Sequence, residues 1–192
     1  MIKIALIGEF QDGKSTLLNA LFGQKLQEIG YGLPETEQAI TYSFNESVKI
    51  MDTPGFNSSR EGDEDITLQA VQEVSLFFLV LCNRQITSET ISLLRQAGGE
   101  TKPFLPILND KDNDNATNIA QESIASLHNA GLSPLLFGKN MPIINAKRWM
   151  QKKKSTFDLG IRQLIYLLTP DSQNISPAER ICCLHQACNQ WI

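Results

Sequence analysis

The sequence has few cysteines, no long apolar run and no excess of positive charge. The longest apolar run, residues 76–82, is far too short to span a bilayer. A strand that begins at Ile2 leaves no room for a signal peptide, so we expect a cytoplasmic protein. With 17 Lys+Arg against 21 Asp+Glu, the composition lacks the basic footprint of a nucleic-acid-binding domain, and nucleic acid is not an expected partner.

The four cysteines fit a reducing compartment and contain no C-x-x-C pair. Cys82 ends the longest apolar run and is expected in the core. Cys182, Cys183 and Cys188 cluster near the C-terminus, where His185 makes a metal site conceivable. A packed helix with free thiols is the favoured interpretation, because the spacing of a metal site is missing.

Alternating strand and helix patterns predict an α/β fold of three layers, with a mostly parallel sheet and helices on both faces. Strands are expected at residues 2–7, 39–44, 47–51, 76–82, 104–108 and 141–144. Helices are expected at residues 14–22, 66–74, 88–97, 116–130, 157–168 and 177–191. We expect one domain over residues 1–169 and a helical extension over residues 170–192.

Residues 8–15 read G-E-F-Q-D-G-K-S, which is a complete G-x-x-x-x-G-K-[ST] phosphate-binding loop between an apolar strand and a helix. Gly8 and Gly13 allow backbone conformations that a Cβ would block. The N–H groups of the loop then form an anion nest at the positive end of the next helix. Lys14 is aimed at the β- and γ-phosphates, and the Ser15 hydroxyl can bind Mg²⁺.

Three further polar stretches follow predicted strands. Asp52-Thr53-Pro54-Gly55 offers a carboxylate for Mg²⁺ and an N–H for a γ-phosphate. Asn109-Asp110-Lys111-Asp112 and Asn145-Ala146-Lys147 come after the strands at residues 104–108 and 141–144. Phosphate sites of such folds lie at the carboxyl ends of the strands, so these stretches are expected at one edge of the sheet.

Together these motifs resemble those of translation-factor-related P-loop GTPases, in their order and spacing over residues 1–168. The phrase around the phosphate loop looks most like bacterial dynamin-like and Era-like GTPases. The resemblance implies a GTP-binding protein that hydrolyses GTP to GDP with Mg²⁺ and works as a conformational switch. The residues implied to hold the nucleotide are Gly8, Gln11, Asp12, Gly13, Lys14, Ser15, Thr16, Asn109, Lys111, Asp112, Asn145, Ala146 and Lys147.

The resemblance also assigns roles. Asp112 would accept hydrogen bonds from the guanine ring, and Asn109 would tie the loops together. Ala146 would offer its N–H to the guanine O6, while Lys147 would lie against the ring. Mg²⁺ would be held by Ser15, Asp52 and a switch threonine, for which Thr36 is a better candidate than Thr41.

The base motif departs from the usual Asn-Lys-x-Asp, since Asp110 fills the second place and the lysine is third. Losing the usual lysine should weaken affinity, unless Lys111 substitutes through a changed backbone. Guanine selectivity depends mainly on Asp112 and is expected to survive. Asn145 replaces a more typical serine, which is a mild change.

Lys14, Thr36, Gly55 and Gln11 are the candidate catalytic residues. Phe56 stands where many relatives carry a glutamine that positions water, and a phenyl ring cannot do this. Slow turnover alone is therefore expected, with activation by a partner or by self-association across the nucleotide face. Arg60 is more simply a solvated surface residue than a charge stabiliser.

Two alternatives stay open. The chain could instead be a nucleotide-dependent interaction module with negligible GTPase turnover, because of Phe56 and the altered base motif.

The basic stretch at residues 147–154 is expected to be a solvated loop, although contact with anionic lipid is possible.

Overall fold

The protein is described by a computed structural model, which describes residues 1–26, 38–56, 61–111, 115–152 and 158–169. A six-stranded sheet in the order β2-β3-β1-β4-β5-β6 forms its centre. Its strands are β1 (Ile2–Ile7), β2 (Ile40–Ser43), β3 (Val48–Asp52), β4 (Leu76–Leu81), β5 (Phe104–Asn109) and β6 (Ile143–Ile144). The edge strand β2 pairs antiparallel with β3, and the other pairs are parallel. The predicted mostly parallel sheet is confirmed.

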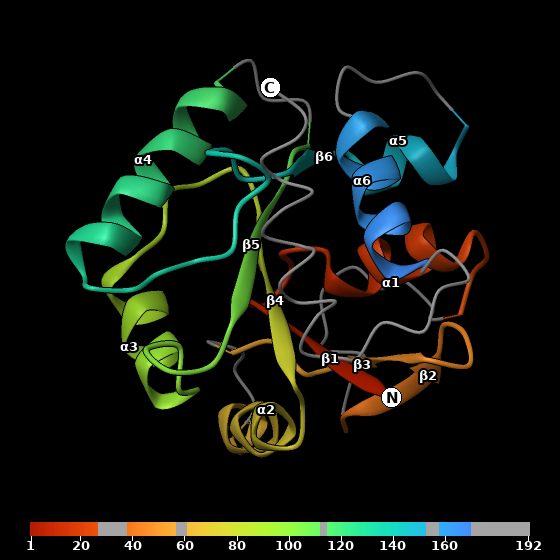
Figure 1. Cartoon of the computed structure of the whole chain (residues 1–192), viewed down its shortest axis with the longest axis horizontal. Coiled ribbons are helices and arrows are strands. Elements are labelled where there is room, and N and C mark those ends of the chain that lie inside the picture. The colour runs from red at the N-terminus through yellow and green to blue at the C-terminus, as the bar shows by residue number, and fades with distance from the viewer. Residues whose placement is uncertain (27–37, 57–60, 112–114, 153–157, 170–192) are drawn as a thin grey trace.

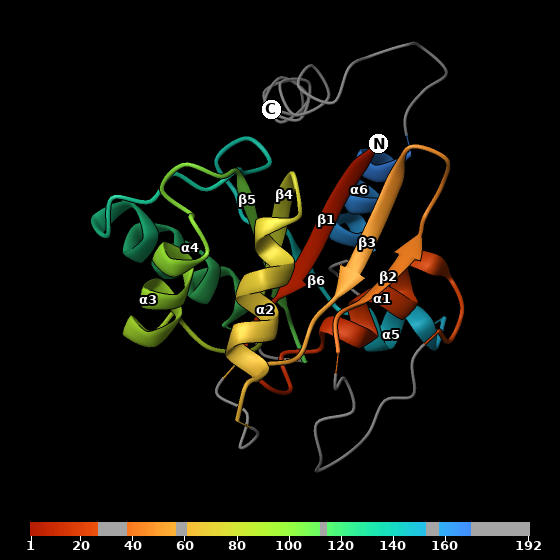
Figure 2. The same cartoon turned by 90° about the horizontal axis from the view of Figure 1, so that it is seen from below.

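Six helices lie on the two faces of the sheet within the described residues. Figure 1 shows α2 (Asp63–Gln72), α3 (Ser88–Gln96) and α4 (Ala116–Asn129) on one side. The other side carries α1 (Lys14–Phe22), α5 (Ala146–Met150) and α6 (Asp158–Leu168). The turned view of Figure 2 keeps the same three layers. The predicted α/β fold of three layers is confirmed.

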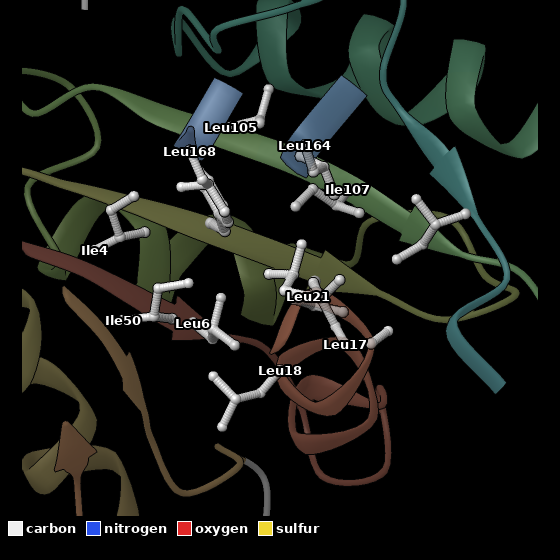
Figure 3. Packing of buried hydrophobic residues seen from close by; sticks show 14 of the residues in the cluster. Ile4, Leu6, Leu17, Leu18, Leu21, Ile50, Leu105, Ile107, Leu164 and Leu168 are labelled. Atoms are coloured by element: carbon white, nitrogen blue, oxygen red, sulfur yellow. The ribbon is translucent and has the colours of Figure 1, made fainter. Parts of the chain in front are cut away.

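Each face of the sheet has its own hydrophobic core, because successive side chains of a strand point to opposite faces. Ile4 and Leu6 of β1 pack on one side, whereas Ala5 and Ile7 pack on the other. Figure 3 shows the first core, in which side chains of α1 and α6 meet those of the strands. Burial on both faces explains why β4 and β5 read as continuous apolar runs.

Several boundaries differ from the sequence prediction by one to three residues, and β6 is confined to Ile143–Ile144. Helix α2 begins at Asp63, three residues before the predicted start. The prediction missed this first turn because its residues are acidic and give no apolar signal, although acidic residues favour the start of a helix. The predicted solvated loop at residues 147–154 is wrong in its first half, where α5 forms. Asn145 caps this short helix, since its Oδ1 accepts from the Arg148 N–H at 3.0 Å.

Several predictions lie outside the described residues. These are the switch candidate Thr36, the base-reading Asp112, Arg60, the cysteine cluster with His185, and the extension over residues 170–192. Thr41, the alternative switch threonine, lies on β2, opposite Met51 of β3. Within the described part of the chain, no helix has the length and apolarity needed to cross a membrane.

Candidate functional site

The phosphate loop runs from the end of β1 to the start of α1, as the motif predicts. Gly13 precedes the helix with a φ of 87°, in the left-handed region that favours glycine. A Cβ at this position would run into the side-chain amide of Asn109. A Cβ on Gly8 would meet the carbonyl oxygen of Val80 on the neighbouring strand β4. Both glycines are therefore required by close packing.

Lys14 is buried and turns back over the loop. Its Nζ donates to the carbonyl oxygens of Gly8 and Glu9, each at 3.0 Å. Burial lowers the pKa of Lys14, while the carboxylates of Asp52, Asp12, Asp63 and Glu9 oppose this shift. The two hydrogen bonds to loop carbonyls hold the ammonium group at the phosphate loop, where the motif places a lysine that contacts phosphate oxygens.

Ser15 and Asp52 come together from the first turn of α1 and the end of β3. The Ser15 Oγ donates to the Asp52 Oδ2 at 2.9 Å, across 37 residues of sequence. Asp52 is fully buried. A hydroxyl and a carboxylate supply the hard oxygen ligands that Mg²⁺ prefers, so this donor pair fits the ion that the motifs imply.

The segment after β3 lies directly against the phosphate loop. Phe10 donates its N–H to the Phe56 carbonyl at 3.0 Å, and Phe56 donates its own to the Gly8 carbonyl at 3.3 Å. A Cβ on Gly55 would lie 2.7 Å from the Cα of Phe10, so only glycine fits here. The Phe56 side chain is buried rather than directed at solvent. The loop that would report a γ-phosphate is thus in backbone contact with the loop that would hold it.

Asn109 links the phosphate loop to the segment that follows β6. Its Nδ2 donates to the Asp12 carbonyl at 3.2 Å, and its Oδ1 accepts from the Ala146 N–H at 3.3 Å. This is the tying role that the resemblance implies for Asn109. The Ala146 N–H, expected to face a guanine O6, here has Asn109 as its acceptor. Lys147 is exposed at the start of α5.

Lys111 reaches the phosphate loop from the third place of the base motif. Its Nζ donates to the Gln11 carbonyl at 2.9 Å, although 100 residues separate the two. Its own N–H donates to the Asn83 Oδ1 at 2.7 Å, which orients the backbone. Gln11 is exposed and has a φ of 66°, a left-handed conformation that turns its carbonyl toward the lysine. The neighbouring Asp110 is buried and cannot play this part.

Two titratable groups near the loop are shifted by burial. Burial raises the pKa of Asp12 to about 7, although the nearby Arg84 and Lys14 lower it in part. Burial also raises the pKa of the Cys82 thiol, against the opposing effect of Lys111. Burial thus disfavours the charged form of both groups, and Arg84 and Lys14 are the cations that favour the ionised form of Asp12.

Comparison with known families agrees with this geometry. The sequence matches the 50S ribosome-binding GTPase family over residues 3–110, which is more than half of the chain. The chain belongs to this GTPase family. The match contains the phosphate loop, the Asp52 motif and Asn109, and it confirms the resemblance drawn from the sequence. As a member of a GTPase family, the chain carries a guanine-nucleotide-binding fold.

Curated relatives of this GTPase are longer proteins. The probable transmembrane GTPase FZO-like of Arabidopsis thaliana is 27% identical over 88% of this chain and 22% of its own length. The GTPase Der of Legionella pneumophila strain Corby is 30% identical over 71% of this chain and 32% of its own length. The chain thus spans between a fifth and a third of the length of these two relatives.

Solved structures share the fold of this GTPase. Era of Aquifex aeolicus, bound to GDP and aluminium fluoride, matches with a TM-score of 0.61 and 19% identity, over 92% of this chain and 60% of that chain. Toc33 of Arabidopsis thaliana, in a dimerization-deficient variant, matches with a TM-score of 0.62 and 12% identity, over 85% of this chain and 81% of that chain. At these identities the likeness concerns the fold.

Sequence reasoning missed two residues that hold the GTPase site together. Asn83 and Arg84 follow β4, where no motif was recognised, and both contact the nucleotide-binding loops. A positive φ of 48° at Asn83 marks a turn there, but an Asn-Arg pair after an apolar run gave no usable signal. Their importance follows only from contacts between distant segments.

Proposed function

We propose that this chain binds GTP and hydrolyses it to GDP and phosphate as a Mg²⁺-dependent conformational switch, with residues 1–169 as the GTPase domain. The observation that carries the proposal is the convergence of the phosphate loop, the Ser15–Asp52 pair and Asn109 at one edge of the sheet. Membership in a GTPase family supports the same conclusion. The candidate catalytic residues are Lys14, Gly55, Gln11 and Thr36, the last outside the described residues.

Guanine recognition is assigned to the base motif. Asp112 would accept from the guanine ring, and Ala146 and Lys147 would lie beside the base. Lys111 replaces the lysine that the motif lacks in its second place, because its ammonium group already binds the Gln11 carbonyl of the phosphate loop. The contact couples the base loop to the phosphate loop and compensates for the altered spacing.

Mg²⁺ would be held by Ser15 and Asp52, with Thr36 completing the set. Bound there, the ion would supply positive charge to the β- and γ-phosphates. Lys14 supplies a second positive charge from the loop itself, and the N–H groups at the start of α1 face the same anion. These groups would bind the phosphates, and the contact of Phe56 with the loop would carry their state to the segment after β3.

Hydrolysis by the chain alone should be slow. The buried Phe56 cannot orient water, and Gln11 is exposed at the rim of the loop. A protein partner, or a second copy across the nucleotide face, would then complete the site. We also propose a cytoplasmic location for the protein.

The first test is competition against fluorescent GDP in Mg²⁺, with unlabelled GDP and ADP added separately. We expect GDP to compete at least about a hundredfold better than ADP, a difference of about 2.7 kcal/mol. Asp112→Ala should remove this preference, whereas Glu46→Gln should not change it, because Glu46 is exposed and lies in the turn before β3, at the opposite end of that strand from Asp52. Equal competition by GDP and ADP in the wild type would refute a guanine site.

The second test is phosphate release at saturating GTP and Mg²⁺. We expect turnover on the order of 10⁻⁴ to 10⁻² s⁻¹ for the chain alone, and an increase with protein concentration if self-association completes the site. Absence of turnover at every concentration, with guanine preference intact, would favour the alternative of an interaction module that binds GTP without hydrolysing it.

A further inference from the structure

The phosphate loop of this protein carries two carboxylates, which is unexpected in a loop built to hold an anion. Glu9 and Asp12 both lie within residues 8–15. Asp12 is only 2% exposed. A buried negative charge beside phosphates would repel them at short range, since charges are poorly screened away from water. The loop therefore needs a fixed positive charge besides Lys14.

Arg84 supplies that charge from the segment after β4. Its NH2 group lies 2.7 Å from the Asp12 Oδ1 and 2.8 Å from the Glu9 Oε2. The Asp12 Oδ2 accepts from the Glu9 N–H at 2.8 Å, so both oxygens of the buried carboxylate are used. Thr90 of α3 donates to the remaining Glu9 oxygen at 3.1 Å. One guanidinium group thus joins both acidic side chains of the loop to the segment between β4 and α3.

We propose that Arg84 is a positioning residue of the phosphate loop, where it neutralises Asp12 and joins it to Glu9 so that the loop can accept the phosphates of a nucleotide. This inference rests on the proposed nucleotide site. It adds a residue outside every sequence motif, and gives the segment after β4 an indirect part in phosphate binding, through Asp12 and Glu9.

The charges in the loop balance only with Arg84 included. Glu9 and Asp12 contribute two negative charges, and Lys14 and Arg84 contribute two positive ones. Without Arg84, the loop would carry one net negative charge toward the incoming phosphates. The Cys82 thiol also lies near Asp12, but burial raises its pKa and keeps it uncharged. Arg84 is 42% exposed, so its loss would not leave a large cavity.

The experiment measures GDP affinity in Mg²⁺ at pH 8 for the wild type, Arg84→Met, Arg84→Lys and the double variant Arg84→Met with Asp12→Asn. Because burial raises the pKa of Asp12 to about 7, this group is mostly ionised at pH 8 in the wild type. The measurement is repeated at pH 9, because Arg84 lowers this pKa and its loss raises the pKa of Asp12 further. We expect Arg84→Met to weaken GDP binding at least about tenfold, as for the loss of a charge-assisted hydrogen bond. Arg84→Lys should retain part of the affinity, and the double variant should recover to within about threefold of the wild type.

Arg95→Met is the matched control, because Arg95 lies on α3, pairs with Glu100 and donates to the Ala130 carbonyl away from the loop. It should bind GDP as the wild type does. Thermal unfolding of each variant separates folding from binding. Arg84→Met binding GDP within twofold of the wild type would overturn the proposal. So would a loss that Asp12→Asn does not restore, or a lowered melting temperature with normal affinity.

The result is separable from the proposed function. If the wild type binds GDP and ADP equally, the guanine assignment fails, while the effect of Arg84 on phosphate binding is still measured with GDP. If the wild type prefers GDP and Arg84→Met has no effect, only the role of Arg84 fails.

Discussion

Replacing Asp12 by asparagine should remove a loss of folding stability that the wild type shows as the pH rises through about 7. Burial raises the pKa of Asp12 from 3.8 to about 7, so folding favours the protonated form of this carboxyl. The contribution of Asp12 to the unfolding free energy is therefore largest below about pH 4, and it is lost as the pH rises through about 7. Asparagine matches the shape of the protonated group and carries no charge at any of these pH values.

The magnitude follows from the shift itself. A difference of about 3 pKa units corresponds to about 4 kcal/mol between the two protonation states. Relaxation around Asp12 reduces this value, and Arg84 stays paired with Glu9 after the change. We therefore expect the unfolding free energy of Asp12→Asn, relative to that of the wild type, to rise by about 2 to 4 kcal/mol between pH 4 and pH 8. The value at pH 4 also contains the loss of one acceptor, because both Asp12 oxygens accept hydrogen bonds and an asparagine has only one oxygen.

Urea unfolding of the nucleotide-free protein between pH 4.5 and pH 8.5 measures this difference directly. The two proteins share all their other carboxylates. The pH dependence of the difference between their unfolding free energies therefore reports on Asp12. Glu46→Gln, at an exposed turn residue, is the control and should give a difference that is flat with pH. The reasoning is refuted if the unfolding free energy of Asp12→Asn relative to the wild type does not rise between pH 4.5 and pH 8.5.

Three further substitutions test the site. Gly13→Ala should abolish GDP binding in a fluorescence titration, because its Cβ would displace the Asn109 amide and the φ of 87° is strained for alanine. Lys111→Met should weaken GDP binding by about tenfold or more, since it removes the charged hydrogen bond to the Gln11 carbonyl. Ser15→Ala should lower GDP affinity in Mg²⁺ but leave affinity in EDTA unchanged, because only the metal-bound state loses a ligand.

Matched controls separate these effects from general destabilisation. Gly23 at the end of α1 has a φ of 67°, which is left-handed like that of Gly13, but a Cβ at Gly23 would meet nothing within 4 Å. Gly23→Ala is therefore the control for Gly13→Ala. It should cost about 1 kcal/mol of stability without changing GDP affinity. Lys139→Met removes an exposed lysine in the connection between α4 and β6 and should bind GDP normally. Normal GDP binding by Gly13→Ala or Lys111→Met would contradict the geometry of the loop. Equal losses of GDP affinity for Ser15→Ala in Mg²⁺ and in EDTA would contradict the assignment of Ser15 as a metal ligand.

Local sequence patterns determined the fold class and the places of the phosphate loop, Asp52 and Asn109. The spacing of Gly8, Gly13 and Lys14 predicted a phosphate loop, because strand, turn and helix follow each other without a gap. Polar residues after apolar runs predicted where Asp52 and Asn109 would lie, since the carboxyl ends of parallel strands share one edge. The helix caps at Gly23 and Gly131 are equally local, because a left-handed residue is signalled by glycine itself.

Only the tertiary structure brought two cations from distant parts of the chain to the phosphate loop. Lys111 binds Gln11 across 100 residues, and Arg84 binds Asp12 across 72 residues. Such pairs depend on strand order and register, which bring the ends of β1, β4 and β5 side by side. Periodicity and turn signals report on neighbours a few residues apart and are blind to these contacts. The sequence alone therefore determined that a phosphate loop exists, and folding determined which distant cations lie against it.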